Sequence, residues 1–275
     1  MRFMIAVDCD GAACVVGQPG RTLSDSGDFE FAKAQATREA DAAVRALFDA
    51  GAKGVVVWDN HGSGANLAFD RLDARCEIVL GTGFRRRWPG LDGAFAGVVM
   101  VGYHAMEVFD PEAQTRRGTR GGVLAHTYSH PAVRWIKVNG QPVGELALDA
   151  AVAGELGVPA IFVSSDACGC QEARSFLPWI EAVVTKDSRG RNAAFSQHPA
   201  RACEAIYTGI RRAVGRLGEM KPFAFPAPLE MELRFKRVSQ AVKARLRWPG
   251  WRLAGPHTIR RRFDDLSGWS GPTGA

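Results

Sequence analysis

The sequence predicts an α/β protein with a mostly parallel open sheet and helices on both faces, followed by a smaller C-terminal α+β unit. Strand-length apolar runs alternate with segments of helical periodicity over residues 1–220, as in sheets built from β–α–β units. Three prolines at residues 222–228 then interrupt regular structure. We therefore expect a main domain over residues 1–220 and a smaller unit over residues 221–275, which packs on it or forms oligomer contacts.

The elements of the main domain follow from apolar spacing and from glycine and proline stops. A strand is expected at residues 3–7, and a helix at residues 30–49 has apolar residues every three or four positions and ends before Gly51. The remaining elements are expected as strands at 55–58, 76–80 and 95–101, a hairpin turning at Asn139-Gly140, a helix at 145–155, strands at 160–163 and 182–184, and a helix at 199–217.

Composition excludes several classes of protein. The net charge is +6, but the arginines come without a zinc-finger or RNA-binding motif, so we expect solvated side chains and no nucleic-acid partner. The longest apolar runs are strand-length, which predicts no membrane span, and no signal-peptide pattern opens the chain. Six scattered cysteines form no disulfide framework, so a cytoplasmic location is expected.

Potential metal ligands follow three of the predicted strands. Asp8 and Asp10 follow the first strand, and because side chains alternate along an extended chain both point to the same side. His61 and His104 follow two later strands, and ligands of open parallel sheets bind at these carboxyl ends. Two carboxylates and two imidazoles favour zinc or a similar transition metal over magnesium. Each residue alone is also compatible with a structural role in a cap or turn.

Three further residues stand out downstream of these strands. His126 and His130 follow a pair of glycines, and Glu145 opens the predicted helix at 145–155. A carboxylate at a helix N-terminus is favoured by the helix dipole, so capping is the simplest structural interpretation of Glu145.

Together these segments resemble the zinc-dependent D-aminopeptidase family associated with bacterial dipeptide transport (the DppA type). The motifs that carry the resemblance occur in the family's order: Val7-Asp8-Cys9-Asp10-Gly11, Trp58-Asp59-Asn60-His61, Val101-Gly102-Tyr103-His104-Ala105, Leu124-Ala125-His126 and Asn139-Gly140-Gln141-Pro142-Val143-Gly144-Glu145-Leu146. Weaker similarity extends to Ser164-Ser165-Asp166 and to Lys186.

The resemblance implies a metallo-aminopeptidase that removes an N-terminal D-amino acid from short peptides inside a ring-like homo-oligomer. It implies two zinc ions per subunit, a two-metal-activated water, and His126 as the catalytic side chain, for which we favour an acid/base role over a nucleophilic one. The implied metal ligands are Asp8, Asp10, His61, His104 and Glu145.

The sequence departs from the family in two places. Asp10 stands where the family usually has glutamate, so this carboxylate is one methylene shorter. The segment from Glu107 to Arg120 is longer than usual, and we expect Arg117 or Arg120 to bind the C-terminal carboxylate of a dipeptide. His130 has no counterpart in the family pattern.

Two other functions are compatible with parts of the sequence. The DxDG pattern at Asp8 is also that of haloacid-dehalogenase-like magnesium phosphatases, in which Ser164, Lys186 and Asp166 would complete the site. A non-catalytic metal- or nucleic-acid-binding protein would fit the basic charge balance. The phosphatase interpretation leaves the histidines unexplained.

Overall fold

A seven-stranded sheet forms the main body of the protein in the computed structural model, which describes residues 1–107 and 121–272. The sheet order is β3-β2-β1-β4-β7-β8-β9, and all neighbouring strands are parallel except β8 and β9. The strands are β1 (Arg2–Val7), β2 (Gly54–Asp59), β3 (Glu77–Val79), β4 (Gly97–Val101), β7 (Ala160–Asp166), β8 (Glu181–Gly190) and β9 (Ala193–Ser196). The predicted mostly parallel α/β sheet is confirmed.

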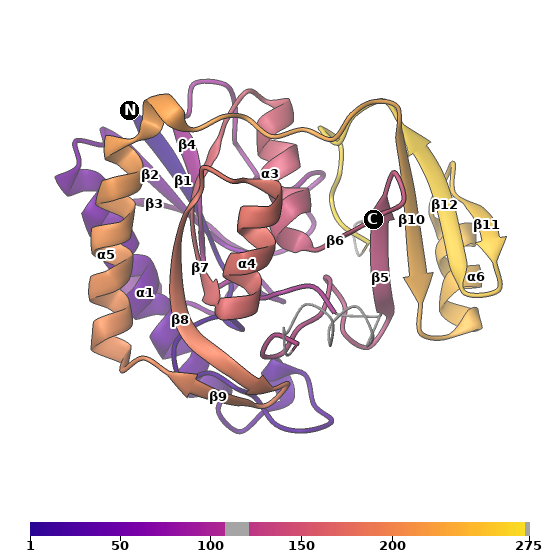
Figure 1. The fold of residues 1–275 in the computed structure, drawn as a ribbon, viewed down its shortest axis with the longest axis horizontal. Coiled ribbons are helices and arrows are strands. Elements are labelled where there is room, and N and C mark those ends of the chain that lie inside the picture. Colours follow the sequence, from indigo (N-terminus) through magenta and orange to yellow (C-terminus); the bar gives the residue numbers. More distant parts are fainter. Residues whose placement is uncertain (108–120, 273–275) are drawn as a thin grey trace.

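Helices cover both faces of this sheet (Figure 1). Helices α1 (Phe29–Asp49) and α5 (Pro199–Gly215) lie on one face, and α3 (Glu145–Glu155) and α4 (Ala167–Phe176) lie on the other. Six of the seven alanines of α1 are buried and recur at helical spacing, which confirms the predicted helix and lets it pack closely on the sheet. No helix in the described part of the chain has the length and apolarity to cross a bilayer.

A second, antiparallel sheet has the order β11-β12-β10-β5-β6 and lies beyond α3 and α4 (Figure 1). Its strands are β5 (Val133–Val138), β6 (Gln141–Val143), β10 (Leu229–Phe235), β11 (Arg252–Gly255) and β12 (Thr258–Phe263). Helix α6 (Val238–Arg247) packs against β10, β11 and β12. Asn139 and Gly140 both have positive φ, as the predicted tight hairpin requires. Residues 221–275 thus pair with an earlier hairpin, and the domain boundary at residue 220 stays a prediction.

The two sheets share one hydrophobic core. Buried residues of α3, of the main sheet and of the second sheet belong to a single apolar cluster, which includes Leu146, Met100 and Leu233. The opposite face of the main sheet packs against α1 and α5 through a separate cluster. The second sheet is therefore fixed against the α3 side of the main sheet.

Candidate active site

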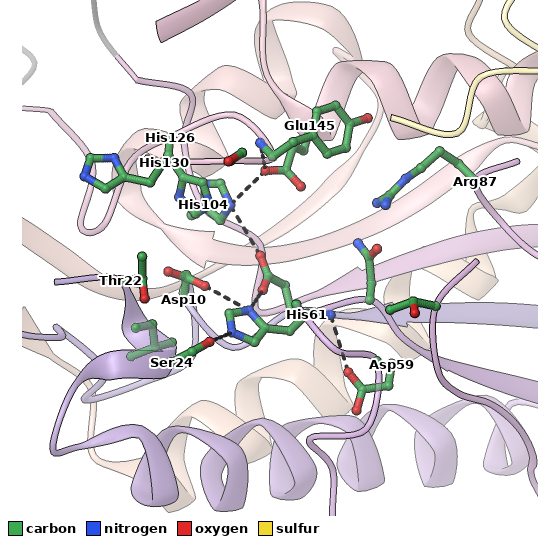
Figure 2. Close-up of a pocket in the computed structure, with 18 of the residues that line it drawn as sticks. Asp10, Thr22, Ser24, Asp59, His61, Arg87, His104, His126, His130 and Glu145 are labelled. Atoms are coloured by element: carbon green, nitrogen blue, oxygen red, sulfur yellow. Dashed lines mark hydrogen bonds and ion pairs between the residues drawn. The ribbon is translucent and has the colours of Figure 1, made fainter. Parts of the chain in front are cut away.

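A cavity of about 890 Å³ lies over the carboxyl ends of β1, β2 and β4 (Figure 2). Strand pairing keeps these ends level, because Val7 is in register with Asp59 on one side and with Val101 on the other. Six of the predicted site residues line this cavity: Asp8, Asp10, His61, His104, His126 and Glu145. The structure therefore brings together residues that are up to 137 positions apart, from Asp8 to Glu145. Arg117 and Arg120 lie outside the described residues.

Two glycines allow the loops after β1 and β4 to approach closely. A Cβ atom on Gly11 would lie 1.7 Å from the carbonyl oxygen of Tyr103, and one on Gly102 would lie 2.2 Å from that of Asp8. Gly102 also has a φ of +69°, which favours glycine. The amide of Gly11 donates a 2.7 Å hydrogen bond to the carbonyl of Gly102. These contacts place the carboxylates that follow β1 beside His104.

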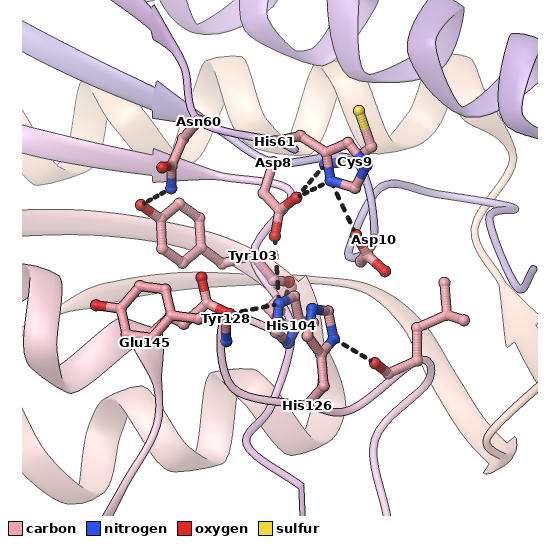
Figure 3. Close-up of polar contacts among 12 residues, drawn as sticks. Asp8, Cys9, Asp10, Asn60, His61, Tyr103, His104, His126, Tyr128 and Glu145 are labelled. Carbon is pink, nitrogen blue, oxygen red and sulfur yellow. Dashed lines mark hydrogen bonds and ion pairs between the residues drawn. The ribbon is translucent and has the colours of Figure 1, made fainter. Parts of the chain in front are cut away.

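The first group of potential ligands comprises Asp8, Asp10 and His61. One ligand atom from each lies within 4.8 Å of the others. Nδ1 of His61 is 2.7 Å from Oδ1 of Asp8 and 3.1 Å from Oδ2 of Asp10 (Figure 3). The Oδ2 atom of Asp10 is buried. Within the described residues it accepts no hydrogen bond of good geometry, even though Nδ1 of His61 is close to it. A buried carboxylate oxygen without a hydrogen-bond donor is suited to a cation.

The second group comprises His104, His126 and Glu145, again with ligand atoms within 4.8 Å of one another. Nε2 of His104 is 3.2 Å from Oε1 of Glu145, and the ring of His126 stacks on that of His104 with centroids 3.9 Å apart. Glu145 is the first residue of α3, and its Oε1 also accepts a 2.6 Å hydrogen bond from the amide of Tyr128. Its carboxylate thus faces the cavity, and no side chain caps the helix.

Asp8 connects the two groups. Its Oδ1 contacts His61, whereas its Oδ2 lies 3.4 Å from Nε2 of His104 (Figure 3). The side chain of Asp8 is 7% exposed, so both oxygens are largely shielded from solvent. A carboxylate with one oxygen in each group has the arrangement of a bridging ligand between two cations.

The outward contacts of the three histidines show which ring nitrogen faces the other ligands, and for His104 and His126 they also fix the tautomer. Nδ1 of His104 lies 3.0 Å from the carbonyl oxygen of Ala105, and Nδ1 of His126 lies 2.8 Å from that of Leu124. Because a carbonyl oxygen only accepts, both Nδ1 atoms carry hydrogen, and in the neutral rings Nε2 has the lone pair. His61 has the opposite orientation, since its Nε2 lies 3.4 Å from Ser24 Oγ. Metal-binding histidines typically have their second nitrogen fixed in this way.

The electrostatics of the site favour bound positive charge. Burial alone would lower the pKa of His104, but Glu145 and Asp8 outweigh it and raise that pKa to about 10. The pKa of His61 is likewise raised well above its usual value by Asp10 and Asp8 against the effect of burial. Without a metal, protons on these two imidazoles therefore balance the buried carboxylates. Cations that displace those protons would serve the same purpose.

His126 has the opposite behaviour. Burial and the adjacent positive charge of His104 lower its pKa below the usual value. At neutral pH the His126 imidazole is therefore uncharged, and its Nε2 is able to accept a proton.

Lys186 and Glu39 hold the loop that follows β1, and sequence reasoning missed how they do so. Nζ of the fully buried Lys186 donates to the carbonyl oxygens of Asp10, Ala12 and Val15 at 2.6, 2.8 and 2.5 Å. Oε1 of Glu39 on α1 accepts a 2.8 Å hydrogen bond from the amide of Ala13. The available signal in the sequence was a lysine two residues after the apolar pair Val183-Val184 of a predicted strand.

Arg87 is not the solvated side chain that its place in an arginine run suggested. Its guanidinium forms a bidentate ion pair with the buried Asp149 at 2.7 and 2.6 Å and lies over the rings of Trp58 and Tyr128. Tyr103 donates a 2.6 Å hydrogen bond to the same carboxylate. Asp149 is one helical turn after Glu145, so the i, i+4 spacing was a sequence signal for this cluster.

Comparisons with known proteins agree with this geometry. The Peptidase_M55 family model, described as D-aminopeptidase, matches residues 1–269. A D-aminopeptidase from Bacillus subtilis (strain 168) is 28% identical over 270 residues, which cover 97% of this chain and 93% of the relative. The solved structure of the Zn-dependent D-aminopeptidase DppA from Bacillus subtilis, described as a self-compartmentalizing protease, matches with a TM-score of 0.87 and 26% identity over 98% of this chain and 93% of that chain. Because the family model spans nearly the whole chain, this protein belongs to the Peptidase_M55 family of D-aminopeptidases.

Proposed function

We propose that this protein hydrolyses the peptide bond after an N-terminal D-amino acid in short peptides, using two zinc ions per subunit. The proposed ligands are Asp8, Asp10, His61, His104 and Glu145. The observation that carries this proposal is the carboxylate of Asp8, which has one oxygen beside His61 and the other beside His104.

The donor set supports zinc. Imidazole nitrogens and carboxylate oxygens are both common zinc ligands, whereas magnesium prefers oxygen alone. When bound, zinc supplies Lewis acidity, which lowers the pKa of a bound water toward about 7 and polarises the scissile carbonyl. Asp10 is shorter than the glutamate usual in the family, but its Oδ2 still reaches within 3.1 Å of His61 Nδ1, as a ligand for the same cation would.

The proposed role of His126 is proton transfer. Its Nδ1–H is held by the carbonyl of Leu124, so its Nε2 accepts a proton from the attacking water and later donates one to the leaving amino group. The lowered pKa of His126 keeps this nitrogen unprotonated at neutral pH. Stacking on His104 fixes the plane of the ring.

The remaining parts of the proposal concern assembly and location. The match to a protein described as self-compartmentalizing supports a homo-oligomer of this chain, for which we propose a ring-like form. We propose a catalytic domain at residues 1–220 and a smaller unit at residues 221–275, which packs on that domain or forms oligomer contacts. None of the six cysteines, all of which lie in the described residues, forms a disulfide bond, which supports a reducing, cytoplasmic location.

The proposal is tested with a stereochemical pair of dipeptides. Zinc-loaded protein should release D-alanine from D-Ala-Gly and act far more slowly on L-Ala-Gly. A chelator should abolish the activity and added zinc should restore it. Metal analysis should give two zinc ions per subunit.

The same preparation distinguishes the alternatives. Magnesium-dependent hydrolysis of p-nitrophenyl phosphate without peptidase activity would favour the phosphatase. Retained zinc without hydrolysis of any peptide would favour a binding protein. Lys186 does not support the phosphatase alternative, because its Nζ contacts backbone carbonyls.

A further inference from the structure

Basic side chains gather at one end of the cavity, beyond His126. His130 and Arg191 both line the cavity, and the ring of His130 meets that of His126 edge-on with centroids 6.2 Å apart. Figure 2 places His130 on the far side of His126 from Arg87, so the two mark opposite ends of the cavity. The proposed function assigns no role to His130 or Arg191.

The contact between His130 and Lys236 fixes which ring nitrogen carries hydrogen. Nζ of Lys236 lies 3.3 Å from Nδ1 of His130 and is oriented by an ion pair with Glu107 at 3.1 Å. An ammonium group only donates, so Nδ1 accepts, and the neutral ring must carry its hydrogen on Nε2. Burial, Arg191 and Lys236 together lower the pKa of His130 to about 4, so the ring is neutral at physiological pH. Within the described residues, its Nε2–H has no acceptor.

Arg191 follows β8 and brings a positive charge to the same end. Its Nη1 donates a 2.6 Å hydrogen bond to the carbonyl of Ala125, the residue before His126. Among the described residues, no carboxylate forms an ion pair with Arg191. Burial lowers the pKa of its guanidinium, and the more distant charges of Glu107 and Asp10 only partly oppose this effect. This differs from Arg87, which Asp149 neutralises in a bidentate pair. Arginine keeps its charge and binds carboxylates in bidentate fashion.

We propose that Arg191 and the Nε2–H of His130 bind the C-terminal carboxylate of a dipeptide substrate. This inference rests on the proposed function and makes it more specific, because it predicts a preference for dipeptides with a free carboxyl terminus. A residue spans at most about 3.6 Å of extended chain. The terminal carboxylate of a dipeptide lies one residue beyond a scissile carbonyl at His126. That residue and a hydrogen bond of about 2.9 Å together cover about the 6.2 Å that separates the rings of His126 and His130.

The substrate pair that tests this subsite is D-Ala-D-Ala and D-Ala-D-Ala amide, which differ only in the terminal carboxylate. For the zinc-loaded protein, KM for the free acid should be about 10- to 100-fold lower than KM for the amide, the factor expected for charge-assisted hydrogen bonds. Arg191→Met and His130→Phe should raise KM for the free acid toward that of the amide and leave KM for the amide within about twofold. Arg191→Lys, which keeps the charge without the fork, should give an intermediate KM.

The matched control is Arg189→Met. Arg189 lies on β8 two residues earlier, pairs with Asp187 at 2.9 Å and does not line the cavity, so both KM values should stay unchanged. Equal losses on the two substrates in Arg191→Met would show that Arg191 only positions the loop at Ala125, and would overturn the subsite. Equal KM values of the unsubstituted protein for acid and amide would overturn it without any variant. Failure to hydrolyse either peptide would contradict the proposed function itself.

Discussion

Removal of the His126 imidazole separates a catalytic role from a metal-binding one. The ring lies within 4.8 Å of potential ligand atoms of His104 and Glu145, so its position alone is compatible with both roles. If His126 transfers protons, His126→Ala should keep two zinc ions per subunit and lower kcat about 10²- to 10⁴-fold. If it is a ligand, zinc content should fall together with activity.

The cost in stability follows from the contacts that the ring makes. His126 loses one ring stack, at a centroid distance of 3.9 Å, and one hydrogen bond to the carbonyl of Leu124. Together these contribute about 2 kcal/mol to the free energy of unfolding. That is less than the 5–15 kcal/mol stability of typical domains, so the variant should remain folded.

The assay combines zinc analysis, steady-state kinetics on a D-dipeptide and urea unfolding. His257→Ala is the matched control, because Nδ1 of His257 also contacts a backbone carbonyl, that of Phe235 at 3.3 Å, and the residue does not line the cavity. The control should lose a similar hydrogen bond and keep its kcat. A His126→Ala protein with one zinc ion per subunit, or with a kcat within about threefold of the unsubstituted value, would refute the proposed role.

Three further predictions concern the groups around the site. Asp8→Asn should weaken zinc binding at both positions, because Asp8 contacts both His61 and His104. A competition titration of this variant that still showed two tight zinc sites would argue against a bridging role of Asp8. Lys186→Met should remove three hydrogen bonds to backbone carbonyls of the loop after β1 and lower the free energy of unfolding by about 3 kcal/mol or more. A urea midpoint equal to that of the unsubstituted protein would contradict the importance of these hydrogen bonds. Glu172→Gln addresses pH dependence: burial raises the pKa of the Glu172 carboxyl to about 7, so the folded state holds more protons than the unfolded state between pH 4.5 and 7. Stability of the chelator-treated protein should therefore fall by up to about 3 kcal/mol as pH rises through this range, and the variant should lack this component. Identical pH profiles of the two proteins, measured by urea unfolding, would count against a buried, protonated Glu172.

Local patterns predict the main sheet and the meeting of four site residues at the ends of its strands, Asp8, Asp10, His61 and His104. The places of His126 and Glu145 in the site are implied only by the resemblance to the family. Alanines at helical spacing in residues 30–49 predict the helix observed as α1. The polar residues that follow the apolar runs mark the carboxyl ends of β1, β2 and β4, which lie level with one another in the sheet. Alternation along the chain after β1 correctly predicts that Asp8 and Asp10 face the same cavity.

Long-range pairing is the part that local patterns do not contain. The hairpin of β5 and β6 is predicted by Asn139-Gly140, but its pairing with β10, almost a hundred residues later, is not. The same limit applies to Arg87, whose partner Asp149 is 62 residues away. The contact between Lys236 and His130 likewise joins the second sheet to the cavity across 106 residues.

The central claim, that a single carboxylate joins two cation sites, is tested most directly by anomalous diffraction from crystals of the zinc-loaded protein at the zinc absorption edge. We predict two peaks per subunit, one within ligand distance of Asp10 and His61 and one within ligand distance of His104 and Glu145, with an oxygen of Asp8 on each. A single peak, or two peaks of which only one contacts Asp8, would contradict this account.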